Sequence, residues 1–211
     1  EHGDVLRRQA ELLAARAAAG DRVIAIVGSR RSEGRTTLMA CLAKLLAELQ
    51  LRVAVVDSDF QRPCLGATLG VNVQAGIEQV LQGECALADV LISSLRDRFT
   101  LAPLRPQSGP ASRLAMVLRG AALFRELRQQ YGLVLLDAGP CEPTGEGDGV
   151  AHWLKAIHVD AAEVTFNARS GGQEQLAFAC RTLADAGIPL LGCIETFSMH
   201  QRPALRILAA S

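Results

Sequence analysis

The loop at residues 28–37 contains residues that could bind a phosphate group. Gly34-Arg35-Thr36-Thr37 begins a helical pattern directly after the apolar run 22–28. Free backbone N–H groups and the helix dipole bind phosphate at such a junction, and Thr36 stands where a hydroxyl would ligate magnesium. Taken alone, the loop is equally compatible with an ordinary strand-to-helix turn. The residues predicted to contact a nucleotide are Arg30, Arg31, Ser32, Glu33, Gly34, Arg35, Thr36 and Thr37.

Three aspartates at predicted strand ends favour the nucleotide site. Asp57 and Asp59 end the run 52–59, and Asp137 lies near the end of the run 132–140. Carboxylates that converge on a phosphate loop could hold the water shell of a magnesium ion and orient or deprotonate a nucleophile. One strand-terminal aspartate more often caps the following helix, but three at such positions favour a shared site. We assign catalytic roles to Arg35, Asp57 and Asp59, and metal ligation to Thr36, Asp57 and Asp137.

A parallel sheet would bring these strand ends together. Apolar runs that predict buried strands alternate with patterns that predict helices. The predicted strands are 22–28, 52–59, 99–104, 132–140, 162–168 and 189–196, and the predicted helices are 36–50, 112–131 and 172–187. This alternation predicts an α/β fold, a mainly parallel sheet flanked by helices on both faces, with ligands beyond the carboxyl ends of the strands. We expect one domain over residues 1–211, with residues 1–20 as an N-terminal helical extension.

Composition narrows the classes of partner and ligand. Lys and Arg number 22, as do Asp and Glu, so no net field favours nucleic acid, and no nucleic-acid partner is expected. No apolar run reaches the roughly 20 residues of a membrane span. The six cysteines form no CxxC pair, which favours a reduced, cytoplasmic chain. The pattern GxGxxG is absent, which argues against a nicotinamide or flavin enzyme.

The aspartates also belong to two recognisable motifs. Residues 57–62 read DSDFQR, of the form DxDxR, and residues 137–140 read DAGP, of the form DxxP. Together with the loop at 28–37, they resemble the Walker A′, Walker B and Walker A motifs of bacterial tyrosine kinases (BY-kinases) of capsule and exopolysaccharide export. That family lies within the MinD/ParA-type class of P-loop NTPases. The segments 76–91, 101–115 and 178–195 also resemble the family, so the similarity covers nearly the whole chain.

The resemblance implies ligands, partners and a location. The ligands would be ATP or ADP with Mg²⁺. The partners would be a membrane polysaccharide co-polymerase or adaptor protein and further copies of the chain in a homo-oligomer. The location would be the cytoplasm, at the inner face of the membrane through that partner.

The Walker A loop departs from the family pattern at two positions. The family usually reads PGxGK[ST]T, and here Arg35 replaces the lysine that reaches the β- and γ-phosphates. A guanidinium keeps the charge but is planar and bulkier, so it is not equivalent. Ser32 replaces a glycine, which would add about 1 kcal/mol of strain if this position needs a positive φ. Arg30 and Arg31 could partly substitute for the lysine, or could be solvated surface charges.

Other departures lie outside the loop. The tail 202–211 has no tyrosine, whereas BY-kinases end in a tyrosine cluster, and only Asp4 and Arg7 resemble the family's ExxRxxR assembly motif. An asparagine that contacts adenine is replaced near Glu195-Thr196. Three functions remain open: a nucleotide-binding accessory or regulator of polysaccharide export with weak or absent kinase activity, an active ATPase or tyrosine kinase that uses Arg35, and a MinD/ParA-type positioning ATPase.

The loop generates a first prediction. Arg35→Lys should strengthen ATP binding by up to about 100-fold, because one well-placed charged hydrogen bond contributes roughly 1.5–3 kcal/mol. Calorimetric titration with ATP and Mg²⁺ measures the change. Weaker binding or turnover in the variant would mean that arginine is the adapted residue.

Overall fold

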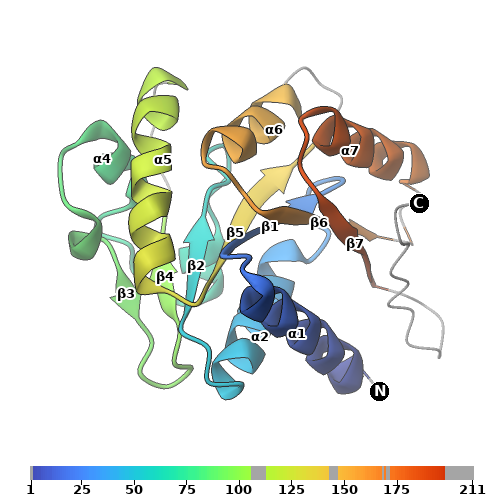
Figure 1. Cartoon of the computed structure of the whole chain (residues 1–211), viewed down its shortest axis with the longest axis horizontal. Coiled ribbons are helices and arrows are strands. Elements are labelled where there is room, and N and C mark those ends of the chain that lie inside the picture. Colours follow the sequence, from blue (N-terminus) through green and yellow to red (C-terminus); the bar gives the residue numbers. More distant parts are fainter. Residues whose placement is uncertain (1, 106–112, 143–146, 168, 170–171, 198–211) are drawn as a thin grey trace.

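The computed structural model describes residues 2–105, 113–142, 147–167, 169 and 172–197. Its centre is a seven-stranded sheet with the strand order β3-β4-β2-β5-β1-β6-β7 (Figure 1). Every neighbouring pair is parallel except β3 and β4, which are antiparallel. The predicted α/β fold with a mainly parallel sheet is therefore confirmed.

The elements follow one another in the predicted alternation. The strands are β1 (Val23–Gly28), β2 (Val53–Asp57), β3 (Ile92–Ser93), β4 (Thr100–Ala102), β5 (Leu133–Pro140), β6 (Ala161–Asn167) and β7 (Leu190–Thr196). The helices are α1 (His2–Ala19), α2 (Arg35–Glu48), α3 (Leu65–Thr68), α4 (Ile77–Gln82), α5 (Arg113–Gln130), α6 (Gly147–Ala156) and α7 (Gln173–Asp185), with a 3₁₀ turn, η1, at Leu87–Asp89.

Helices cover the sheet on both faces, and each interface is a separate hydrophobic core. On one face α4, α5, α6 and α7 pack against the sheet, and on the other α1 and α2 do so (Figure 1). The largest side chains of the two cores include Phe124 and Met39, which are fully buried. The buried apolar runs of β1, β2 and β5 reflect this double coverage.

Some elements, including α3, β3 and α6, were not predicted from the sequence. β3 has only two residues, too few for a periodic pattern. α6 begins with Gly-Asp-Gly, which has low helix propensity. The predicted strand 99–104 is shorter than expected, because Pro103 has no N–H for the sheet and its carbonyl instead accepts the N–H of Ile77 at 2.8 Å.

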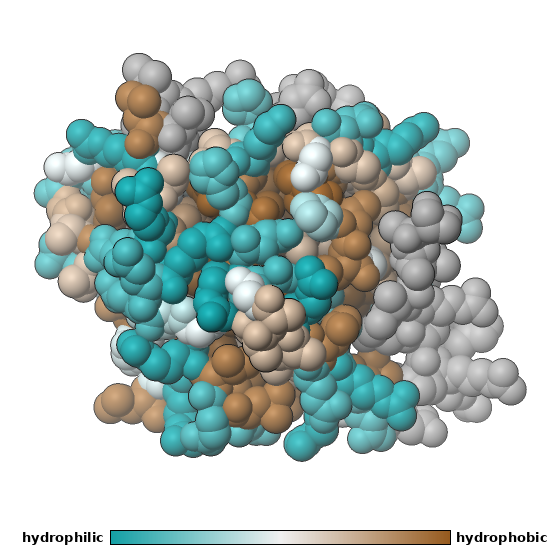
Figure 2. All heavy atoms as spheres, viewed as in Figure 1, coloured by the Kyte–Doolittle hydropathy of each residue, from teal (hydrophilic) through white to brown (hydrophobic). Residues whose placement is uncertain are grey.

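The face shown in Figure 2 carries both hydrophilic and hydrophobic residues. Hydrophilic residues extend across this face, and apolar residues show between them in separate groups. Within the described residues, no helix is long and apolar enough to cross a membrane.

A buried polar contact joins the first helix to the sheet. Glu163 in the middle of β6 and Gln9 of α1 are each 2% exposed, and Gln9 Nε2 donates a hydrogen bond to Glu163 Oε1. The other carboxylate oxygen, Oε2, is buried without a partner among the described residues. Burial raises the pKa of Glu163 to about 7, although the hydrogen bond from Gln9 opposes the rise.

This contact predicts a pH dependence of stability. The folded chain keeps a proton on Glu163 up to about pH 7, whereas the unfolded chain releases it near 4.5. The free energy of unfolding should therefore fall by on the order of 3 kcal/mol as pH rises through this window, and the contribution of this group is constant above it.

Glu163→Gln should remove the contribution of Glu163 to this decline, since glutamine does not titrate. Urea unfolding at about pH 5 and about pH 8 measures it, and the exposed Glu11→Gln in α1 is the control. Parallel pH profiles for the parent and Glu163→Gln would contradict the assignment.

Candidate functional site

The predicted loop and aspartates lie at one edge of the sheet. The parallel register pairs Asp57 of β2 with Asp137 of β5, and Gly28 ends the neighbouring strand β1. The loop after Gly28 leads into α2, whose N-cap residue is Gly34 at φ 74°. Ser32 has φ 62°, so the serine that replaces the family's glycine adopts the strained left-handed conformation that the sequence comparison anticipated.

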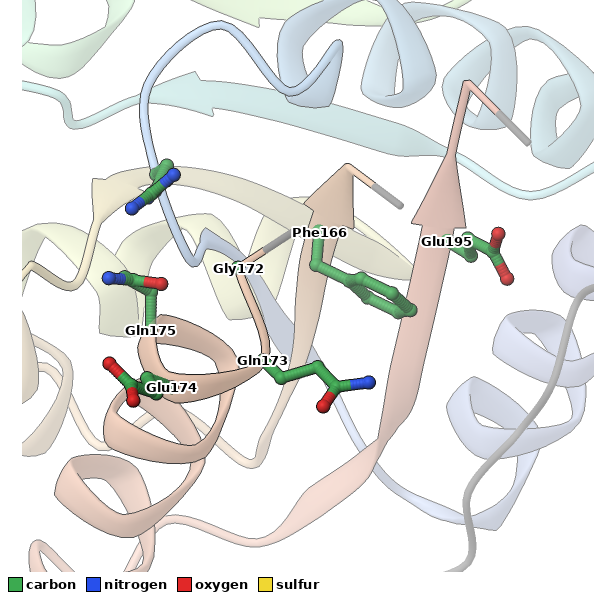
Figure 3. Close-up of a pocket in the computed structure, with 7 residues that line it drawn as sticks. Phe166, Gly172, Gln173, Glu174, Gln175 and Glu195 are labelled. Carbon is green, nitrogen blue, oxygen red and sulfur yellow. The ribbon is translucent and has the colours of Figure 1, made fainter. Parts of the chain in front are cut away.

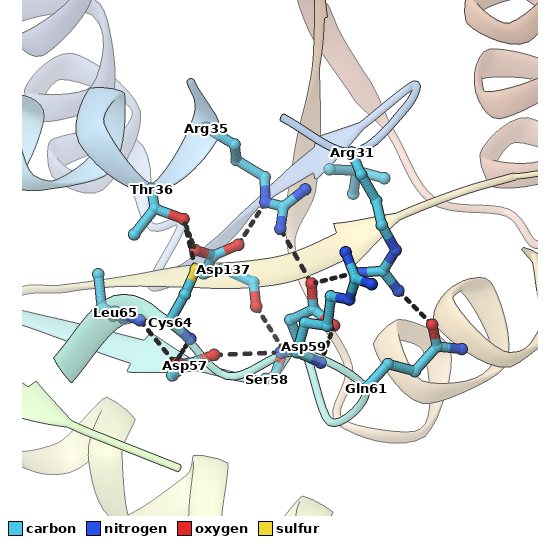
Figure 4. Close-up of polar contacts among 12 residues, drawn as sticks. Arg31, Arg35, Thr36, Asp57, Ser58, Asp59, Gln61, Cys64, Leu65 and Asp137 are labelled. Atoms are coloured by element: carbon cyan, nitrogen blue, oxygen red, sulfur yellow. Dashed lines mark hydrogen bonds and ion pairs between the residues drawn. The ribbon is translucent and has the colours of Figure 1, made fainter. Parts of the chain in front are cut away.

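Arg35 points back into the site rather than out to solvent (Figure 4). Its side chain is 8% exposed, Nε donates to Asp137 Oδ1, and Nη2 donates to Asp59 Oδ2 at 3.3 Å. Burial alone would lower the pKa of Arg35, but the attraction of Asp137 and Asp59 raises it above its ordinary value. A Cβ at Gly28 would lie 2.7 Å from Nη1 of Arg35, so glycine at this position makes room for the guanidinium.

Asp137 uses both carboxylate oxygens within the chain. Oδ1 accepts from Arg35, and Oδ2 accepts the hydroxyl of Thr36 at 2.9 Å. The Thr36 hydroxyl also lies 3.3 Å from the Cys64 thiol. The first two residues of α2 are therefore tied to the end of β5.

Asp59 is the second carboxylate that pairs with arginine. Its Oδ2 accepts from Arg31 Nη1 at 3.3 Å as well as from Arg35. Its Oδ1 accepts the backbone N–H of Arg62 at 3.0 Å. The carboxyl lies against Gly139, where φ is 78° and a Cβ would be 3.2 Å from the Asp59 Cγ. Asp59 thus holds two arginines of the loop.

Asp57 has a different role. It is fully buried, and its carboxylate accepts the backbone N–H groups of Leu65 at 3.0 Å, Cys64 at 3.2 Å and Asp59 at 3.3 Å. Burial and the negative charge of Asp137 raise the pKa of Asp57 to about 7, against the effect of these hydrogen bonds. This carboxylate caps the chain entering α3, the alternative role that the sequence left open.

Carboxylates also hold the loop backbone. Glu33 is 3% exposed and accepts the Ser29 hydroxyl at 2.7 Å, the Arg30 N–H at 3.0 Å and the Asn167 N–H at 3.3 Å. The N–H of Arg31 donates to Glu142 at 3.2 Å. The first half of the loop is therefore fixed by side chains of the protein itself.

Two hollows adjoin the loop. The smaller, about 230 Å³, is lined by Arg31, Ser32, Glu33, Gly34, Arg35, Thr36, Thr37, Asp59, Arg62, Cys64 and Thr68. The larger, about 600 Å³, is lined by Arg30, Phe166, Gly172, Gln173, Glu174, Gln175 and Glu195. Figure 3 shows the ring of Phe166 between the start of α7 and Glu195 on β7. Unlike the neighbouring residues 31–37 of the loop, Arg30 lines the larger hollow and not the smaller one.

All the predicted site residues therefore surround the loop, but they do not share one task. Arg35, Asp59, Asp137 and Thr36 form one connected network, whereas Asp57 and Glu33 serve the backbone. Ser29, Arg62, Cys64 and Thr68 were not predicted individually as site residues. Ser29 lies within the loop 28–37 and Arg62 ends the DxDxR motif, so these positions were the available signal. The tail 202–211 and the loop 106–112 lie outside the described residues.

The carboxylates do not fit a magnesium ion in this arrangement. Within the described residues, no group of three His, Cys, Asp or Glu side chains could hold a metal. The guanidinium of Arg35 spans the gap between Asp59 and Asp137, and these two carboxylates already accept hydrogen bonds on all four oxygens. Metal ligation by Thr36, Asp57 and Asp137 stays a prediction, which this geometry does not favour.

Comparison with known proteins finds similar sequences among tyrosine kinases and partitioning ATPases. Over 122 residues the chain is 28% identical to the tyrosine-protein kinase Wzc of Salmonella typhi, which covers 58% of this chain and 17% of Wzc. It is 38% identical over 122 residues to the chromosome-partitioning ATPase Soj of Thermus thermophilus, which covers 56% of this chain and 46% of Soj.

Solved structures extend the likeness. The VpsO kinase domain superposes with a TM-score of 0.76 at 20% identity, covering 92% of this chain and 93% of that domain. MinD of Pyrococcus horikoshii, solved with Mg-ADP, gives 0.65 at 24% identity, covering 82% and 69%. The chain is therefore similar in fold to BY-kinase domains and to MinD, and similar in sequence to Wzc and Soj. No protein-family model matches this BY-kinase-like chain, and it spans less than half the length of Wzc and of Soj.

The arginine–aspartate network predicts the effect of one substitution. Asp59→Asn removes the charge that holds Arg35 and Arg31, so the nucleotide-free protein should lose about 1–3 kcal/mol of stability. At roughly 2–4 °C per kcal/mol for a chain of this size, the melting temperature should fall measurably.

The exposed Asp185→Asn in α7 is the matched control, since it changes the same charge without a buried partner. An Asp59→Asn protein that melts at the parent temperature in nucleotide-free buffer would show that the network does not stabilise the fold.

Proposed function

We propose that this BY-kinase-like chain binds ATP or ADP and acts as an accessory or regulator of exopolysaccharide or capsule biosynthesis and export, with weak or absent kinase activity. The observation that carries the proposal is the engagement of Arg35 with Asp59 and Asp137. In this arrangement the loop would still bind phosphate, while the carboxylates that would serve phosphoryl transfer are held by arginine.

The phosphates would bind at the start of α2. The first N–H groups of a helix have no partner within the helix, and here they belong to Arg35, Thr36 and Thr37 beside the smaller hollow. Arg31 lines the same hollow and adds positive charge. Backbone donors and guanidinium groups together are the usual chemistry of phosphate recognition.

The base would lie in the larger hollow. Phe166 offers an aromatic face, and the polar side chains of Gln173 and Glu195 could bond the polar edge of a base. Arg30 lines this hollow from the loop, so it joins the two ends of the site. These side chains would take the place of the asparagine that contacts adenine in BY-kinases.

Weak phosphoryl transfer would follow from the same contacts. A catalytic base must be free to accept the proton of the nucleophile, whereas Asp59 accepts from Arg31, Arg35 and the Arg62 N–H. Asp57 is fully buried and bonded to backbone N–H groups. Neither carboxylate is positioned to activate a nucleophile without rearrangement.

The proposed partners and location rest on the resemblance to BY-kinases. We propose one P-loop domain, at the inner face of the membrane through a polysaccharide co-polymerase or adaptor. Arg7, which resembles part of the assembly motif, lies 4.0 Å from Glu48 of α2, and both side chains are exposed. This loose contact leaves Arg7 able to exchange partners in a homo-oligomer.

Calorimetry with ADP and ATP in magnesium-containing buffer tests the proposed function. We expect saturable binding of both nucleotides, and Arg31→Gln should weaken it by about 10-fold through loss of one charged hydrogen bond. The exposed Arg8→Gln in α1 is the control and should bind as the parent does.

Phosphate release measured on the same samples separates the alternatives. The proposal expects little or no turnover. Steady ATP hydrolysis that Asp59→Asn abolishes would instead support the active ATPase or kinase, and absence of nucleotide binding would refute the proposed function.

A further inference from the structure

We propose that the guanidinium of Arg35 takes the place of the divalent cation in this site, so that the chain binds nucleotide without magnesium. The inference rests on the proposed nucleotide binding and deepens it. It concerns how the charge of the phosphates and of the aspartates is balanced.

The charges of Asp59 and Asp137 are balanced without a metal by the arginines that contact them. Asp59 and Asp137 carry two negative charges at the edge of the sheet, and Arg31 and Arg35 bring two positive charges into contact with them. Arg35 alone bridges both carboxylates. In a magnesium site the cation serves this purpose, because it offsets the repulsion between nearby acids and phosphates.

The position of Arg35 also allows it to bridge acids to phosphate. A guanidinium has five N–H donors in a planar fork, and Arg35 uses only Nε and Nη2 on the aspartates. Within the described chain, Nη1 has no hydrogen-bond acceptor, and Arg35 lines the smaller hollow beside the start of α2. A phosphate at that helix start would lie next to the remaining donors of the guanidinium.

A magnesium ion would have to displace this arrangement. All four oxygens of Asp59 and Asp137 already accept hydrogen bonds. A dication near them would be repelled by Arg35, which Gly28 accommodates so closely that even a Cβ there would lie 2.7 Å from Nη1. The guanidinium is therefore built into the site and cannot move aside without breaking a buried ion pair.

Lysine at this position would behave differently. An ammonium is a compact point charge on a flexible stem and lacks the planar fork that spans two carboxylates. Arg35→Lys should leave one aspartate unpaired and so create a place for a cation. The variant should bind nucleotide more tightly with magnesium than without it.

The decisive experiment is calorimetric titration of the intact chain with ADP, once with Mg²⁺ and once with EDTA. The inference expects dissociation constants that agree within about threefold for the parent. In Arg35→Lys the dissociation constant should rise by about 10-fold or more in EDTA. The exposed Arg8→Lys in α1 is the matched control and should behave as the parent.

The outcomes separate this inference from the proposed function. Parent binding that depends on magnesium overturns the inference and leaves the proposed function intact. Absence of ADP binding in both buffers overturns the proposed function and the inference with it. If Arg35→Lys does not fold, the comparison of the two buffers for the parent decides alone, and the melting temperature of the nucleotide-free parent should be unchanged by Mg²⁺.

Discussion

The ion pairs of Arg35 with Asp59 and Asp137 are the contact on which the rest of the site depends. They join the first residue of α2 to the end of β5 and to the segment after β2. A buried carboxylate without a partner is costly, and so is a buried guanidinium. Arg35 therefore needs both carboxylates, and this pairing fixes the start of α2 against them.

The fold determines which strand ends meet, whereas individual side chains determine the charges at that edge. The parallel sheet brings the ends of β1, β2 and β5 together, as open parallel sheets do generally. A single side chain at the start of α2 then determines which charges meet at that edge. With arginine there, Asp59 and Asp137 face a permanent cation. Fold similarity alone would not distinguish a chain with arginine at this position from one with lysine.

The sequence predicted the parts of the structure that depend on periodicity and chain order. The apolar runs identified β1, β2 and β5, and their parallel order predicted that Asp57 and Asp137 would meet. The pattern could not predict the direction of the Arg35 side chain, because a long arginine can extend to solvent or fold back. That choice depends on Gly28, Asp59 and Asp137, which come from three separate elements.

The burial of polar side chains is the second property that the sequence pattern could not predict. Glu163 lies in a correctly predicted strand, yet its contact with Gln9 depends on how α1 crosses that face of the sheet. Asp57 likewise stands in the motif at residues 57–62, but its hydrogen bonds to Cys64 and Leu65 depend on the turn that follows. Motifs indicated which residues gather, whereas packing determined the partner of each.

A double-mutant cycle between Arg35 and Asp59 tests the central claim most directly. Denaturant unfolding of the parent, Arg35→Met, Asp59→Asn and the double variant, in nucleotide-free buffer, gives the coupling energy between the two side chains. The account predicts a coupling of about 1–3 kcal/mol. Additivity within about 0.5 kcal/mol would show that the two side chains do not pair and would contradict the account.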